Sequence, residues 1–297
     1  MKPAHLLLAV SVAAAWGINF VAIDYGLDSF PPLLFTALRF AVAAVPAVLF
    51  VGRPQVAWRW VVAVGLVLGA LQFGLLFVAI KAGVPAGLSS LVLQSQALFT
   101  ALFSAVLLGE RPTRGQLLGM GVALAGIVLV ATDFGASGPL PAFLLVLASA
   151  ASWAMGNVLT RKAAPPDSFR FLVWVSVVPP LPLLALSALT EDLSALHAPE
   201  PSSLVALGYV AWVSTVFGFG VWTTLIRRYG ATAVAPYSLL VPVFGMSSTA
   251  LVLGEQLTVL RVVGAGVVLV GVGLTALTGR RRTPPGRQDS SRLVEVS

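Results

Sequence analysis

The sequence predicts an all-α integral membrane protein with ten transmembrane helices, arranged as two five-helix repeats of inverted topology. Three observations lead to this fold class. Of the 297 residues, 58% are hydrophobic and 10% are charged, whereas a soluble domain has about 25% charged residues. Ten apolar segments, each close to the ~20 residues that cross a bilayer, follow one another with short turns between them. Finally, part of the first half recurs about 145 residues later.

The apolar segments cover nearly the whole chain up to residue 279. The expected helices are 4–24, 31–52, 57–80, 86–108, 114–131, 139–160, 168–189, 203–226, 231–253 and 259–279. The first apolar run continues through Ile23, past any signal-peptide cleavage site, so we expect it to remain as the first helix. Residues 280–297 are charged and rich in Pro and Ser, which predicts a disordered cytoplasmic tail.

The distribution of Lys and Arg predicts that both termini are cytoplasmic, because cytoplasmic turns carry an excess of these residues. With the N-terminus inside, we place fourteen of them on the inner side, Arg261 included. Only Lys81, Arg227 and Arg228 are placed on the outer side. The pI of 10.6 then reflects membrane topology, and we expect no nucleic-acid partner. The expected partners are the lipid bilayer and a small-molecule substrate.

The residue inventory argues against an enzyme. There is no Cys, and the two His residues lie near predicted helix ends, so the sequence offers no disulfide and no cysteine metal site. It also lacks the nucleophile–base pair that a membrane-embedded enzyme needs. We therefore expect no metal and no other cofactor. A channel is a lesser alternative, because a pore usually shows rings of charge or filter carbonyls.

A repeat divides the chain into residues 1–135 and 136–279. At a shift of 145, five residues of the first half fall on identical residues of the second: Gly109 on Gly254, Glu110 on Glu255, Gly119 on Gly264, Gly121 on Gly266 and Gly126 on Gly271. Each half has five predicted helices, and an odd number forces the second half into the opposite membrane orientation. Inverted repeats are associated with secondary transporters, whose substrate site lies near the membrane midplane between the repeats.

Several segments are typical of one transporter family: "WGINFVAIDYGLDSFPPLLFTALRF", "PAGLSSLVLQSQALFT", "LGERPTRGQLLG", "SWAMGN" and "YSLLVPVFG" followed by "LGEQLT". Through them the chain resembles the EamA family of the drug/metabolite transporter superfamily, especially its exporters of cysteine and O-acetylserine. The resemblance implies an inner-membrane exporter of amino acids or related metabolites that works by alternating access. Another metabolite or drug-like substrate remains open, as does the choice between a monomer and a weak homodimer.

Asn19 and Asn157 interrupt the apolar first helix of each half. A buried amide without a partner costs about 1–3 kcal/mol, so each must bond to another helix or face a wet path. Trp16 precedes Asn19 by three residues and Trp153 precedes Asn157 by four, which places each pair on one helix face. We predict that these four residues line the substrate path. Hydrogen bonding between helices is the alternative.

The fourth and ninth helices add two more candidates. Gln94 and Gln96 point to different sides of a helix. The 145-residue shift groups the face of Gln96 with the face of Tyr237, whereas Gln94 falls on the apolar Leu239. We therefore predict that Gln96 and Tyr237 line the path and that Gln94 packs between helices. Pro242 is expected to kink the ninth helix, because proline removes one backbone hydrogen bond.

Gln72 and Arg39 complete the predicted path. Gln72 is a mid-span amide for which path lining and packing are both open. Arg39 lies about 12 Å inside the second helix, where an Arg costs about 2.5–3.5 kcal/mol. It either snorkels outward, pairs with Asp24, or serves as an anion-complementary group that attracts a substrate carboxylate.

Two glutamates, Glu110 and Glu255, are predicted to be structural. Each follows an "LG" pair in a turn that we place on the cytoplasmic side. An acid near the N-terminus of the following helix interacts favourably with the helix dipole. Thr113 and Gln116 additionally fit a capping box at the start of the fifth helix.

Overall fold

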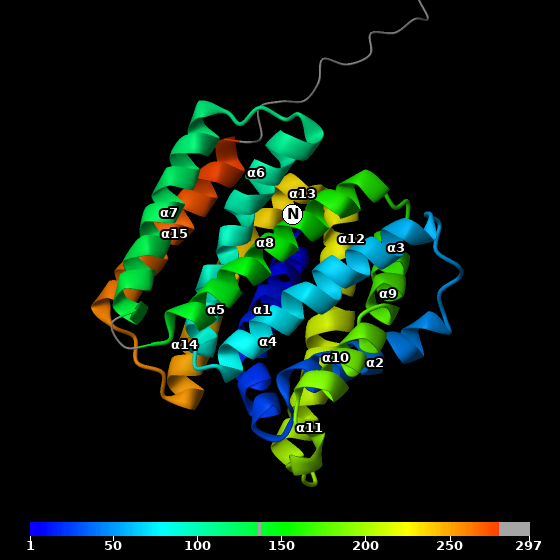
Figure 1. Ribbon diagram of the computed structural model, residues 1–297. Helices are drawn as coiled ribbons and strands as arrows, with labels where there is room; N and C mark the ends of the chain where they lie inside the picture. The colour runs from blue at the N-terminus through cyan, green and yellow to red at the C-terminus, as the bar shows by residue number, and fades with distance from the viewer. Residues whose placement is uncertain (136–137, 279–297) are drawn as a thin grey trace, which may run out of the picture.

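The computed structural model describes residues 1–135 and 138–278, and this part of the chain contains helices and no strand (Figure 1). The predicted tail, 280–297, lies outside the described residues. Nine helices in the described ranges are long and apolar enough to cross a membrane. The apolar helix α2, Pro32–Val48, is shorter, at 17 residues. The chain is therefore a multi-pass membrane protein.

The helix bounds lie close to the predicted spans, and several spans are built from two successive helices. The bounds are α1 Pro3–Ser29, α2 Pro32–Val48, α3 Trp58–Val64, α4 Gln72–Lys81, α5 Ala86–Val92, α6 Gln96–Leu108, α7 Arg114–Gly135, α8 Leu140–Ala163, α9 Ser168–Val177, α10 Pro180–Thr190, α11 Pro201–Gly208, α12 Phe219–Tyr229, α13 Ala231–Val234, α14 Val241–Leu253 and α15 Val259–Thr278. The first helix continues to Ser29, so Asp24 lies within it and not at its end.

Four spans are interrupted at related positions. A π-helical segment, Gly65–Leu71, separates α3 from α4, and another, Tyr209–Gly218, separates α11 from α12. A 3₁₀ segment, Leu93–Ser95, separates α5 from α6, and another, Ala235–Leu240, separates α13 from α14. The members of each pair lie about 145 residues apart, as in the sequence repeat. Such irregular turns often mark functional positions inside helices.

Pro242 directly follows one of these interruptions. It occupies the first turn of α14, where its missing N–H costs no helical hydrogen bond. The corresponding residue in α6 is Ala97, yet a 3₁₀ segment precedes it as well. Proline therefore fits the break in this span, but a break forms in the other half without proline.

Each π-helical segment packs against the first helix of the other half. From α8, Ser152 Oγ donates a hydrogen bond to the Val67 carbonyl at 2.7 Å. From α1, Trp16 Nε1 donates to the Ser214 carbonyl at 2.9 Å. Buried backbone carbonyls require partners, and these side chains supply two of them. These two contacts join segments that lie 85 and 198 residues apart in the sequence.

The helix ends define two faces. The N-terminal face carries His5 and Tyr229, whose ring nitrogen and hydroxyl lie 2.6 Å apart. The opposite face carries Lys81, whose Nζ donates to the Leu27 carbonyl at 2.6 Å. It also carries Asp133, whose carboxylate pairs with Arg261 Nε at 2.7 Å.

These contacts correct part of the predicted side assignment. We placed Arg227 and Arg228 on the outer side and Arg261 with Glu255 on the inner side, and all four assignments are wrong. The contact between His5 and Tyr229 places residues 227 and 228 on the face of the N-terminus. Among the described residues, ten basic side chains then lie at the N-terminal face: Lys2, Arg53, Arg59, Arg111, Arg114, Arg161, Lys162, Arg170, Arg227 and Arg228. Only Lys81 and Arg261 lie at the opposite face.

Helices α7 and α15 run side by side along their lengths (Figure 1). Their backbones come close at glycines: a Cβ added at Gly271 would lie 2.3 Å from the Ala123 nitrogen, and one added at Gly119 would lie 2.6 Å from the Thr275 nitrogen. Gly119 and Gly126 on α7 and Gly264 and Gly271 on α15 form a glycine ladder that permits this close contact. Gly121 and Gly266 are exceptions, because a Cβ added at either one would meet no atom within 4 Å.

Candidate functional site

A stripe of polar side chains runs along the seam between α6 and α8. Asn157 Nδ2 donates to Gln96 Oε1 at 3.1 Å and to Thr100 Oγ1 at 3.4 Å. One helical turn further, Arg161 Nη1 donates to Ser104 Oγ at 3.0 Å. The three α6 residues recur every four positions, so they share one face of the helix. Thr100 and Ser104 were not predicted, although this spacing from Gln96 was available in the sequence.

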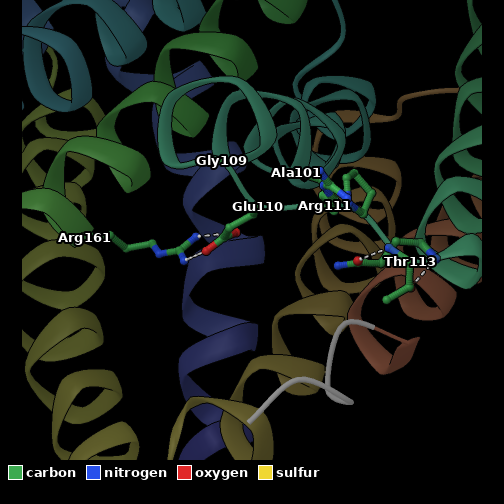
Figure 2. Close-up of a pocket in the computed structure, with 8 residues that line it drawn as sticks. Ala101, Gly109, Glu110, Arg111, Thr113 and Arg161 are labelled. Carbon is green, nitrogen blue, oxygen red and sulfur yellow. Dashed lines mark hydrogen bonds and ion pairs between the residues drawn. The ribbon is translucent and has the colours of Figure 1, made fainter. Parts of the chain in front are cut away.

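The polar stripe ends in a pocket at the N-terminal face, with a volume of about 740 Å³. Its lining residues come from α6, the α6–α7 turn, α7 and α8: Ala101, Gly109, Glu110, Arg111, Pro112, Thr113, Gln116 and Arg161. Figure 2 shows Arg161 and Glu110 pointing toward each other across this pocket, and they form an ion pair. Both side chains are about half exposed. Exposed ion pairs contribute little stability, so this pair constrains the pocket only weakly.

Glu255, the repeat counterpart of Glu110, makes different contacts at the opposite face. Its carboxylate accepts a hydrogen bond from the Gly87 nitrogen at 3.1 Å and another from Thr249 Oγ1 at 2.9 Å. Gly87 lies in the first turn of α5, so Glu255 links the end of α14 to the start of α5. We expected this acid to stabilise the helix that follows it, but it stabilises a distant helix instead.

The α6–α7 turn contains the predicted capping box. The Thr113 nitrogen donates to Gln116 Oε1 at 2.9 Å, and the Gln116 nitrogen donates to Thr113 Oγ1 at 3.2 Å. These reciprocal bonds satisfy two free amides at the start of α7. Glu110 takes no part in this cap and pairs with Arg161 on α8.

Near the opposite face, α1, α5 and α14 pack in backbone contact. A Cβ added at Gly17 would lie 2.4 Å from Phe244 Cβ, and one added at Gly245 would lie 2.5 Å from Ser90 Oγ. A Cβ at Gly87 would clash with the side chains of Thr249 and Glu255. At these three glycines the helices are therefore in close contact.

Arg39 is buried between α2, α4 and the second π-helical segment, with 2% of its surface exposed. Its Nε and Nη2 donate to Thr215 Oγ1 at 3.3 and 3.2 Å. Its guanidinium carbon lies 4.0 Å from the centre of the Phe73 ring. Both structural alternatives for Arg39 are wrong: the side chain does not snorkel outward, and within the described ranges it pairs with neither Asp24 nor any other carboxylate.

The family model described as "EamA-like transporter family" matches residues 4–132 and 140–277. The chain belongs to the EamA-like transporter family. A protein of Salmonella typhimurium named "Probable amino-acid metabolite efflux pump" is 41% identical over 287 residues, which cover 93% of this chain and 96% of the relative. An Escherichia coli protein of the same name is 39% identical over 276 residues, covering 90% and 92%.

A solved structure titled "Crystal structure of protein" superposes on this EamA-like transporter with a TM-score of 0.63. It covers 95% of this chain and all of the other chain, at 21% sequence identity. At that identity the likeness concerns the fold alone. It shows that the helix arrangement of Figure 1 is one that occurs in a known structure.

Two predicted path residues of this EamA-like transporter lie on α1. Trp16 packs its ring against Phe219 and Trp222, with ring centres 5.0 Å apart in both cases. Asn19 is buried, and its Oδ1 has no hydrogen-bond partner among the described residues. An unsatisfied buried acceptor is costly, which makes Asn19 available to a ligand or to water.

The remaining candidates make separate contacts. Gln72 is buried, and its backbone carbonyl accepts from Ser149 Oγ at 2.7 Å. Trp153 and Tyr237 are partly buried in apolar clusters. Gln94 Nε2 lies 3.5 Å from the Ser238 carbonyl in the opposing 3₁₀ segment. The structure thus joins Gln96 directly to Asn157, and path lining by the predicted residues stays a prediction.

Proposed function

We propose that this EamA-like transporter exports amino acids or related small metabolites, such as cysteine and O-acetylserine, across the inner membrane by alternating access. Two relatives that are about 40% identical carry the name "Probable amino-acid metabolite efflux pump". A more distant relative, 27% identical, is named "Uncharacterized inner membrane transporter YedA". The first name supports the proposed substrate class, and the second supports the proposed location in the inner membrane.

One observation carries the alternating-access part of the proposal: among the described residues, a pocket opens at the N-terminal face, whereas helices pack tightly near the opposite face. At the N-terminal face, a polar pocket of about 740 Å³ leads to the polar stripe on α6 and α8. At the opposite face, α1, α5 and α14 close the way by backbone contact. A carrier in one of its two states has this asymmetry, whereas an open channel is continuous.

We further propose that the chain consists of ten transmembrane helices in two inverted halves, 1–135 and 136–279. The paired π-helical and 3₁₀ interruptions support this arrangement, because each recurs about 145 residues later. The central path would then lie between the halves, with lining from the six polar and aromatic candidates on α1, α6, α8 and the ninth span, together with Arg39 and Gln72. The six are Trp16, Asn19, Gln96, Trp153, Asn157 and Tyr237.

The N-terminal face is proposed to be cytoplasmic, because ten of the described basic side chains lie there. The chain has no native Cys, which permits single-cysteine labelling without further changes. With an impermeant thiol reagent on intact cells, Gln256→Cys should be labelled, and Arg111→Cys should be labelled only after permeabilisation. The reverse pattern would show that we have the orientation inverted.

Transport itself is tested with purified protein in liposomes loaded with single amino acids, O-acetylserine or unrelated drug-like cations. We expect saturable efflux of at least one amino acid or derivative. Efflux confined to the drug-like compounds would show that the substrates are not amino acids or their derivatives. Unsaturable conductance would indicate a channel. Native mass spectrometry of the same preparation distinguishes a monomer from a weak homodimer.

A further inference from the structure

Three buried side-chain atoms have no hydrogen-bond partner among the described residues: Asn19 Oδ1, Arg39 Nη1 and Ser95 Oγ. Only Arg39 carries a charge. A buried charge without an opposite charge is strongly unfavourable. The contacts around Arg39 therefore decide whether its positive charge is balanced within the folded chain.

The partners of Arg39 satisfy one edge of its guanidinium group. Thr215 Oγ1 accepts from Nε and Nη2, and the same hydroxyl donates to the Val210 carbonyl at 2.8 Å. The Phe73 ring covers one side of the guanidinium plane, with 4.0 Å between the guanidinium carbon and the ring centre. These groups hold the plane in place but are all neutral. The Nη1 edge, with its two N–H donors, is left free.

No carboxylate of the described chain balances this charge. Glu191, the acid at the start of α2, accepts from the Leu33 and Leu34 nitrogens at 2.7 and 3.1 Å. The ion pairs of the described residues are Arg161–Glu110, Arg170–Asp167 and Arg261–Asp133. The balancing anion must therefore come from outside the described chain.

From this geometry we propose that Arg39 binds the carboxylate of the transported solute through its free Nη1 edge. This inference rests on the proposed export function and narrows it to substrates that carry a carboxylate. An Arg binds a carboxylate through two parallel N–H donors, here one on Nη1 and the second one on Nη2. The Phe73 ring fixes the plane in which these donors lie. On α1, which packs against the same π-helical segment, Asn19 Oδ1 is a second polar atom without a partner.

Little free space lies next to the Arg39 partner Thr215 in this conformation. The space beside Thr215, lined by residues of α2, α9 and the π-helical segment, has a volume of about 10 Å³. That is room for one water molecule at most. Binding therefore requires the helices around the π-helical segment to separate, as they do when a carrier changes state.

The test uses liposomes with the full-length protein and pairs each amino acid of the panel with its α-carboxamide, which keeps the shape but lacks the negative charge. We expect wild type to move the acid at least about 10-fold faster than the amide. In Arg39→Gln the preference for the acid should vanish. Without the positive charge, transport of the acid should fall about 10-fold, to the rate of the amide. Arg39→Lys keeps the charge without the planar fork and should retain part of the preference.

Thermal stability in detergent serves as the readout that does not depend on turnover. The acid, and not the amide, should raise the Tm of wild type, and Arg39→Gln should lose this shift. If Arg39→Gln does not fold, the acid–amide comparison in wild type still shows whether transport requires the carboxylate of the solute. Equal transport of acid and amide by wild type, or undiminished acid transport by Arg39→Gln, would overturn the inference and leave the export function standing. If wild type moves no acid and no amide, the proposed function itself fails.

Discussion

Asn157→Ala and Gln96→Ala should each lower the initial rate of export by an order of magnitude or more, whereas Gln94→Ala should have a smaller effect. Asn157 and Gln96 bond to each other across α8 and α6 at 3.1 Å. Removing either side chain leaves the other partly unsatisfied in a low-dielectric surrounding, at a cost of about 1–3 kcal/mol. Since about 1.4 kcal/mol corresponds to a factor of ten, a loss of this size is expected if the pair lines the path.

Gln94 provides the matched control. It lies two residues from Gln96 and is the same residue type, but among the described residues its side chain makes a long hydrogen bond, 3.5 Å, to the Ser238 carbonyl. Rates are compared in liposomes at equal protein content, after each variant has been checked for a single peak in size-exclusion chromatography. A larger loss in Gln94→Ala than in Gln96→Ala would mean that the path runs along the other face of this span.

Gly87→Val should abolish transport, because it prevents closure of the opposite face. A Cβ at this position would lie 2.2 Å from Thr249 Oγ1 and 2.7 Å from a Glu255 carboxylate oxygen. The larger valine side chain would displace Thr249 and Glu255 and break the hydrogen bond between Glu255 and the Gly87 nitrogen that ties the end of α14 to α5. A carrier that cannot close one face cannot complete its cycle, so we expect only background flux.

Cysteine accessibility tests the same variant independently of transport. Ser90 is 1% exposed, so Ser90→Cys should react slowly with an impermeant thiol reagent in the wild-type background and quickly beside Gly87→Val. The control is Gly121→Val, because a Cβ at Gly121 meets no atom within 4 Å. If Gly87→Val transports normally, or leaves Ser90→Cys protected, the closure of α5 against α14 has no part in the cycle.

Several features of this protein follow from its sequence alone. The helix bounds match the predicted spans because crossing a bilayer requires a long apolar segment with internally satisfied backbone, and both requirements are local. The Thr113–Gln116 capping box was likewise predictable, since it joins residues three positions apart. The glycine ladder of α7 and α15 could be predicted because only small residues let two helix backbones approach closely.

The tertiary structure decided what the polar residues contact. Arg39 meets Thr215, 176 residues away, and not Asp24. Asn157 meets Gln96, 61 residues away, and Glu255 stabilises the start of α5, 168 residues away. Thr215 was overlooked because a single hydroxyl in an apolar helix carries no pattern of its own. Hydropathy and helical spacing report which face of one helix a side chain occupies. Which helices meet at that face depends on the packing of all of them together, which no local pattern encodes.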